Sequence, residues 1–168
     1  MVQVTFSGNP VTLPNKEVKV GDALPNFTVL ANDMSPVTAQ DTAGKIRLFS
    51  VSPSLDTSVC SDQAKRFSDE ASSLGDNVEI YYVTCDLPPA QKRWAEVNKV
   101  DNLTLLSDHR DLSFGEAFGV TMQELRLLAR SVFVVDENDK VTHVEYVPEG
   151  TDHPDYEKAL QAVKELTK

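Results

Sequence analysis

Cys60 lies where a cysteine side chain can become a nucleophile. The apolar segment 46–51 is followed by Pro53, Thr57 comes four residues after that proline, and Cys60 comes three residues later. We expect the apolar segment to be a strand, the proline to begin a turn, and Cys60 to lie in the first turn of a helix. Because the N–H groups at a helix start are unpaired and partly positive, they favour a thiolate over a thiol. The spacing therefore predicts a reactive thiolate at Cys60.

A purely structural interpretation of Cys60 competes with this one. Cys60 begins an apolar stripe of helical spacing with Ala64 and Phe67, and free cysteines are commonly buried in protein cores. A core cysteine, however, needs no hydroxyl three residues before it. We therefore prefer the reactive interpretation, in which Pro53 limits the freedom of the loop and Thr57 places its hydroxyl beside the sulfur.

The same helix start argues against a dithiol exchanger. Proteins of that class carry Cys-x-x-Cys at this point, and here Thr57 occupies the first cysteine position. A hydroxyl cannot form a disulfide. What remains is a lone thiolate suited to attack on an electrophilic oxygen or sulfur.

Strand and helix patterns alternate along the rest of the chain. We expect strands at 27–30, 46–51, 78–84, 103–106, 131–135 and 141–147, and helices that begin near residues 60, 88, 114, 122 and 154. This order predicts an α/β sandwich with a mixed central sheet. Right-handed crossovers would bring the ends of strands 46–51 and 78–84 to one sheet edge, where catalytic loops gather and where Cys60 would lie.

Composition narrows the classes of function. The chain has 168 residues, enough for one domain, and a net charge of −10 that argues against nucleic acid or an anionic membrane as a partner. Its apolar runs are too short to span a membrane, and its first ten residues lack the basic and apolar parts of an export signal. With two cysteines and three scattered histidines, we expect a reducing, cytoplasmic location and no metal site.

The segment Pro53-Ser-Leu-Asp-Thr57-Ser-Val-Cys60 resembles the active-site signature of peroxiredoxins. Other stretches resemble the bacterial thiol peroxidase branch of that family, and together they span nearly the whole chain: 2–21, 86–88, 90–94, 127–134 and 154–157. The resemblance implies a thioredoxin-like three-layer sandwich. It also implies that residues 1–168 form one domain with an extra N-terminal β-hairpin at about 1–20, that the protein is a homodimer, and that it needs no cofactor.

The activity that this resemblance implies is reduction of hydrogen peroxide and organic hydroperoxides in antioxidant defence. Cys60 would be the peroxidatic residue and would become a sulfenic acid, which thioredoxin or another thiol would then reduce. The resemblance also assigns Arg130 to the site. If strand 131–135 runs antiparallel to its neighbours, Arg130 lies beside Cys60, where a guanidinium stabilises a thiolate. The alternative for Arg130 is a solvated cation that caps a helix at 122–129.

The chain departs from the branch at the residue that resolves the sulfenic acid. The family's resolving cysteine corresponds to Ala95 here. The remaining cysteine, Cys85, is either a core residue at the end of strand 78–84 or a substitute resolving residue. A disulfide requires Cα atoms within about 7 Å, so a Cys60–Cys85 bond would require the first helical turn to unwind. Otherwise an external thiol resolves the sulfenic acid, as in one-cysteine peroxiredoxins.

A peroxide-sensing module is the alternative function on the same fold. Its Cys60 sulfenic acid would form but would not turn over with any reductant. Multiple turnovers with a thiol distinguish the enzyme from the sensor.

Overall fold

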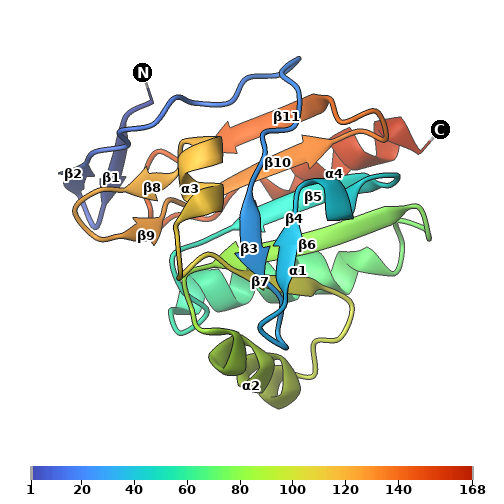
Figure 1. The fold of residues 1–168 in the computed structure, drawn as a ribbon, viewed down its shortest axis with the longest axis horizontal. Helices are drawn as coiled ribbons and strands as arrows, with labels where there is room; N and C mark the ends of the chain where they lie inside the picture. The colour runs from blue at the N-terminus through green and yellow to red at the C-terminus, as the bar shows by residue number, and fades with distance from the viewer. Residues whose placement is uncertain (1, 168) are drawn as a thin grey trace.

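The centre of the computed structural model, which describes residues 2–167, is a mixed seven-stranded sheet with the order β11-β10-β5-β6-β7-β3-β4 (Figure 1). Met1 and Lys168, the ends of the expected domain, lie outside the described residues. Strands β5, β6 and β7 are parallel, while β10, β11, β3 and β4 each run antiparallel to a neighbour. The sheet consists of β3 (Thr28–Leu30), β4 (Pro36–Thr38), β5 (Ile46–Val51), β6 (Val78–Thr84), β7 (Thr104–Ser107), β10 (Ser131–Val135) and β11 (Val141–Tyr146).

Helices cover both faces of this sheet and confirm the α/β sandwich. Helices α1 (Ser58–Ala71) and α4 (Tyr156–Leu166) pack on one face, which buries Leu48 of β5 and Val132 of β10. Helix α3 (Ser113–Phe118) lies on the other face, over Phe49 and Phe133 (Figure 1). Side chains of a strand alternate between the two faces of a sheet. Because helices cover both faces, all six residues of β5 are buried, and four of them are apolar.

Two further helical elements contact strands of the sheet. Helix α2 (Pro88–Asn98) contacts β7, and the 3-10 helix η1 (Gln40–Thr42) follows β4. No helix within residues 2–167 combines the length and the apolar character that a membrane span requires.

The N-terminal hairpin is shorter than the expected range. Strands β1 (Val4–Phe6) and β2 (Asn9–Val11) pair antiparallel across a turn in which Ser7 and Gly8 have φ angles of 50° and 80°. After β2, the chain reaches β3 with only one isolated bridge, between Ala23 and Lys140. The hairpin is tied to the body of the protein by a parallel bridge from Thr5 to Glu149.

The prediction of a helix at 122–129 is wrong. This segment forms a small hairpin of β8 (Thr121–Met122) and β9 (Leu127–Leu128), and Arg126 in its turn has a φ of 53°. Met122 and Leu128 are both buried in the core. Contacts with the N-terminal segment hold the turn, since the Gln123 N–H donates to the Thr12 carbonyl at 2.9 Å. Tertiary pairing therefore overrides the helical propensity of Gln-Glu-Leu-Arg-Leu-Leu.

A buried carboxylate precedes α3. The Asp108 side chain is 2% exposed and accepts the N–H groups of Phe114 and Gly115 at 2.9 and 2.8 Å. Burial raises its pKa to about 6, although the two hydrogen bonds act in the opposite direction. The folded protein therefore holds the Asp108 proton more tightly than the unfolded chain does.

This difference predicts how stability changes with pH. The Asp108 contribution should be fully present below the unfolded pKa and should be lost as pH rises through about 6. The loss should be about 2–3 kcal/mol between about pH 4 and pH 7. The free energy of unfolding is measured with urea at several pH values in this range, for the parent and for Asp108→Asn. The loss is the part of the decrease with rising pH that the parent shows and Asp108→Asn does not. An equal pH dependence of the free energy of unfolding in both proteins would contradict the prediction.

Candidate active site

A single carboxylate holds the loop between β5 and α1. Asp86, which follows β6, accepts the Ser54 hydroxyl at 2.6 Å and the Leu55 N–H at 2.7 Å. The Thr84 hydroxyl donates to the same carboxylate at 2.8 Å. Pro53 is buried at the start of this loop, where its ring fixes φ. The path of the chain into α1 is therefore set before the helix begins.

Cys60 is the third residue of α1 and its side chain is fully buried. Its sulfur accepts a hydrogen bond from Arg130 Nη2 at 3.3 Å. Arg130 directly precedes β10, whose register pairs Ser131 with Val51 at the end of β5. The antiparallel strand thus brings Arg130 to the sheet edge where the Cys60 loop starts. A thiolate at this position has the guanidinium and the helix N-terminus as positive neighbours.

Arg130 is itself 2% exposed, and three hydrogen bonds to two acceptors other than the sulfur hold it. Its Nε and Nη2 donate to the Gly150 carbonyl at 3.0 and 2.8 Å, and its Nη1 donates to Gln63 Oε1 at 2.8 Å. Gln63 in turn donates to the Ser50 hydroxyl at 2.7 Å. The alternative of a solvated helix cap is therefore wrong, because Arg130 is buried and the segment 122–129 is a hairpin and not a helix.

Tyr82 of β6 contacts the backbone of Cys60. Its buried hydroxyl donates to the Cys60 carbonyl at 2.8 Å and shares a hydrogen bond with the Ser52 hydroxyl at 2.7 Å. Burial raises the pKa of Tyr82 well above its ordinary value, so this hydroxyl keeps its proton. The hydrogen bond fastens the first turn of α1 to the sheet.

Thr57 is the N-cap residue of α1, and it is exposed. Its hydroxyl donates to the Ser54 carbonyl at 3.1 Å, not to the Cys60 sulfur. The proton of this hydroxyl is therefore engaged by the loop, while its oxygen can still accept a hydrogen bond. The expected placement of the hydroxyl beside the sulfur has no hydrogen bond to support it within residues 2–167.

Cys85 and Cys60 are both free thiols on different sides of the sheet. Along β6, Tyr82 faces a cluster with Ala64 of α1, whereas Val83 and the following Cys85 pack against the core on the α3 face. Burial, and after it the charges of Asp108 and Asp86, raise the pKa of Cys85 to about 12. Cys85 is thus a protonated thiol at neutral pH and a poor attacking group.

Ala95, the position that the resemblance assigns to a resolving cysteine, lies on α2. Ala95 of α2 packs in the cluster that contains Ala64 and Tyr82. The neighbouring Trp94 donates its indole N–H to the Ser61 hydroxyl at 3.2 Å, next to Cys60 in sequence. The face of α2 that packs on this cluster therefore carries an apolar side chain where the resemblance would place a thiol.

Sequence reasoning did not identify Gln63, Tyr82, Asp86 or Gly150 as part of the site. Gln63 had a detectable signal, because it is a polar residue beside Ala64 on the stripe that begins at Cys60. The role of Gly150 rests on its backbone carbonyl, for which no side-chain pattern exists. Among residues 2–167, no group of three or more His, Cys, Asp or Glu side chains could hold a metal ion.

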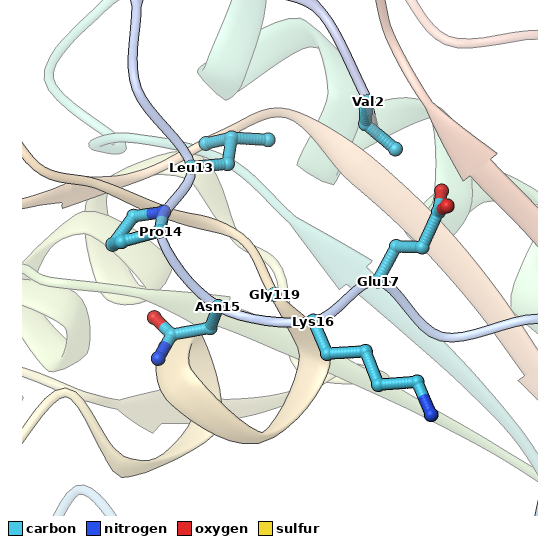
Figure 2. Close-up of a pocket in the computed structure, with 7 residues that line it drawn as sticks. All are labelled: Val2, Leu13, Pro14, Asn15, Lys16, Glu17 and Gly119. Atoms are coloured by element: carbon cyan, nitrogen blue, oxygen red, sulfur yellow. The ribbon is translucent and has the colours of Figure 1, made fainter.

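A hollow of about 410 Å³ is lined by none of the residues of this site. Figure 2 shows the residues that line it. Its lining comes from the segment after β2, from the N-terminus and from the end of α3: Val2, Leu13, Pro14, Asn15, Lys16, Glu17 and Gly119. The lining contains no thiol and no arginine. The hollow therefore lacks the paired thiol and guanidinium that Cys60 and Arg130 form.

Comparisons with known proteins identify the family of the chain. The Redoxin family profile matches residues 19–160. A thiol peroxidase of Halalkalibacterium halodurans is 60% identical over 98% of both chains, and one of Bacillus subtilis is 56% identical over the full length of both. Among solved structures, a peroxiredoxin-like protein from Aquifex aeolicus superposes with a TM-score of 0.92 at 37% identity, covering 99% of this chain and 98% of its own. The expected thioredoxin-like fold is confirmed. The chain therefore belongs to the Redoxin family, as a thiol-dependent peroxidase that reduces a peroxide with electrons from a thiol.

Proposed function

We propose that Cys60 is the peroxidatic residue of this enzyme and that Arg130 activates it. The observation that carries the proposal is the 3.3 Å contact between Arg130 Nη2 and the Cys60 sulfur, between two side chains that are almost completely shielded from water. Shielding strengthens the attraction between a guanidinium and a thiolate. In this proposal Pro53 fixes the loop, and the Thr57 oxygen, whose own proton is donated to the Ser54 carbonyl, accepts a hydrogen bond from the hydroperoxide O–H.

The proposed reaction is displacement at oxygen. The Cys60 thiolate attacks one oxygen of hydrogen peroxide or an organic hydroperoxide, an S–O bond forms and the O–O bond breaks. The leaving oxygen takes a proton and departs as water or an alcohol, and Cys60 is oxidised to the sulfenic acid. Arg130 stabilises the negative charge as it moves from sulfur to the leaving oxygen.

An external thiol is the proposed resolving group. Its thiolate attacks the Cys60 sulfenic sulfur, hydroxide leaves and is protonated to water, and a second thiol reduces the mixed disulfide. Cys85 is poorly suited to this step, because it lies on the other face of the sheet and its raised pKa keeps it protonated. Ala95 cannot take its place.

The burial of Cys60 adds a requirement to this step. A small peroxide needs only a narrow approach, whereas a protein thiol such as that of thioredoxin must come within bonding distance of a sulfur that is 0% exposed. The first turn of α1 therefore has to open, and the Tyr82 hydrogen bond to the Cys60 carbonyl has to break. In the open state Arg130 and the sulfur separate.

The cytoplasmic location and the homodimer belong to the same proposal. Two free cysteines in the chain are consistent with a reducing compartment. The homodimer is supported by the family resemblance alone. Residues 1–168 are proposed to act together as one domain.

Trapping of the oxidised sulfur tests the proposal. The protein is treated with one equivalent of hydrogen peroxide, then with dimedone, and its mass is measured without reductant. We expect one adduct, on Cys60, no internal disulfide, and the same result in Cys85→Ser. Turnover of Cys85→Ser with thioredoxin or dithiothreitol should stay within about twofold of the parent.

Two outcomes would count against it. If no adduct formed on Cys60, the assignment of the nucleophile would be wrong. If the parent formed an internal disulfide that Cys85→Ser lacked, Cys85 and not an external thiol would resolve the sulfenic acid.

A further inference from the structure

The carbonyl of Gly150 determines where the Arg130 guanidinium lies. Two of the four hydrogen bonds that Arg130 donates go to this oxygen, from Nε at 3.0 Å and from Nη2 at 2.8 Å. The same Nη2 also contacts the Cys60 sulfur at 3.3 Å. A displacement of the Gly150 carbonyl would therefore move the one nitrogen that faces the nucleophile. Gly150 is not in a helix or strand, so its position depends on contacts made by its loop.

The N-terminal hairpin supplies these contacts. The Gly150 N–H donates to the Thr5 carbonyl at 2.7 Å, and the Thr5 N–H donates to the Pro148 carbonyl at 2.8 Å. The ring of Phe6 lies so close to Gly150 that a Cβ added there would be 2.5 Å from a ring carbon. Residues of the N-terminal hairpin thus pack directly against the loop whose Gly150 carbonyl binds Arg130, although the two segments are more than 140 positions apart in sequence.

Glu149 fastens the loop to the hairpin through its carboxylate. One oxygen accepts the Thr5 hydroxyl and the Gly8 N–H, both at 2.8 Å. The other accepts the Ser7 N–H at 3.2 Å, the Thr151 N–H at 2.7 Å and the Thr151 hydroxyl. These hydrogen bonds lower the pKa of Glu149 to about 2, so the carboxylate stays ionised at working pH. All five donors point at oxygen, and an amide nitrogen in place of either oxygen would face a donor.

We propose that Glu149 is a positioning residue for peroxide reduction: by clamping the N-terminal hairpin to the loop 148–151, it sets the Gly150 carbonyl and so aims Arg130 at Cys60. This inference rests on the proposed roles of Cys60 and Arg130. The N-terminal hairpin is then part of the active-site support. A two-stranded hairpin is marginally stable alone, so the carboxylate orders the hairpin and the loop together.

The test compares Glu149→Gln with a matched control, Glu124→Gln. Glu124 also uses its carboxylate to hold the N-terminal segment, accepting the N–H and the hydroxyl of Thr12 at 2.7 Å each, and it makes no hydrogen bond to the loop 148–151. In stopped-flow experiments, with Trp94 fluorescence as the signal, the oxidation of Cys60 by hydrogen peroxide and its re-reduction by dithiothreitol are measured separately.

We expect Glu149→Gln to slow the oxidation step about tenfold, because small displacements of catalytic groups cost this much or more. Re-reduction should change by less than about twofold, because the sulfenic acid at Cys60 carries no thiolate charge for Arg130 to stabilise. Glu124→Gln should match the parent in both steps. Glu149→Asp, which keeps the carboxylate, should recover part of the oxidation rate.

Gly150→Ala tests the same link from the other side. Its Cβ meets the Phe6 ring, so the loop must shift, and we expect the same selective loss in the oxidation step. This variant decides the question if Glu149→Gln does not fold. Equal slowing of both steps, or equal slowing in Glu124→Gln, would reduce Glu149 to general structural support and overturn the inference.

A Cys60→Ser arm separates this inference from the function beneath it. If Cys60→Ser still reduced peroxide, the proposed nucleophile would fail and the clamp with it. If Cys60→Ser were inactive and Glu149→Gln oxidised at the parent rate, only the clamp would fail.

Discussion

Cys60→Ser is expected to lower the rate constant for hydrogen peroxide reduction at least about 10⁴-fold, the scale on which a nucleophile's removal is felt. A serine hydroxyl at this position remains protonated, and oxygen is a poorer nucleophile than sulfur toward peroxide oxygen. The fold should be unaffected, because the substitution replaces only the sulfur of a side chain that is buried in the first turn of α1. Peroxide consumption with dithiothreitol as the reductant measures the loss, and circular dichroism checks the fold.

Cys85→Ser is the matched control for this variant. It makes the same change at the only other cysteine, on the opposite face of the sheet. Parent-like activity in Cys85→Ser together with an inactive Cys60→Ser would assign the chemistry to a single sulfur. Residual turnover by Cys60→Ser at more than about a hundredth of the parent rate would contradict a Cys60-based mechanism.

The elements that could be predicted most accurately are those whose side chains are buried on both faces. Strands β5, β6 and β10 begin and end where their apolar or β-branched runs do, at 46–51, 78–84 and 131–135. Burial selects such a run directly. The segment 121–128 behaves otherwise, because its conformation depends on contacts with Thr12 and its own turn carries a positive φ at Arg126. Neither the contact with Thr12 nor the positive φ of Arg126 can be predicted from the residue types of this segment.

The candidate site was predictable where it depends on topology. An antiparallel β10 carries Arg130 to the edge where β5 delivers Cys60, and the two side chains are in contact in the structure. The support of Arg130 was not predictable. It comes from a backbone carbonyl in a loop and from a hairpin at the other end of the chain, and neither leaves a spacing or a residue type that marks it.

The side-chain directions of Thr57 and Cys85 were also not predictable from the sequence. The spacing predicts that the Thr57 hydroxyl lies beside the sulfur, but in the structure this hydroxyl donates its hydrogen bond to the Ser54 carbonyl. Spacing also put Cys85 at the end of the strand beside β5, but the alternation of β6 turns its thiol to the α3 face. In both cases the residue could be placed near Cys60 from the sequence. The direction of its side chain could not, because that depends on contacts that the motif does not contain.

Arg130→Lys is expected to slow the oxidation of Cys60 by about 10²–10³-fold, the usual cost of removing a preorganised donor that stabilises developing charge. Lysine keeps the charge, but its ammonium cannot reproduce a planar fork that serves the Gly150 carbonyl, Gln63 and the sulfur together. The lost factor corresponds to about 3–4 kcal/mol of activation free energy. Stopped-flow oxidation by hydrogen peroxide measures it.

Arg126→Lys is the control for Arg130→Lys, because Arg126 is exposed, lies four residues away and takes no part in the site.

Arg130→Lys should also lower the free energy of unfolding by about 1–3 kcal/mol, since it leaves the buried Gly150 carbonyl and Gln63 oxygen short of donors. The two losses have different origins, and urea unfolding separates them. A variant destabilised to this extent that still oxidised at the parent rate would show that Arg130 holds the fold and does not act on the sulfur. If the rate fell and stability did not, the guanidinium would act on the reaction alone, and the Gly150 and Gln63 contacts would serve only to aim it.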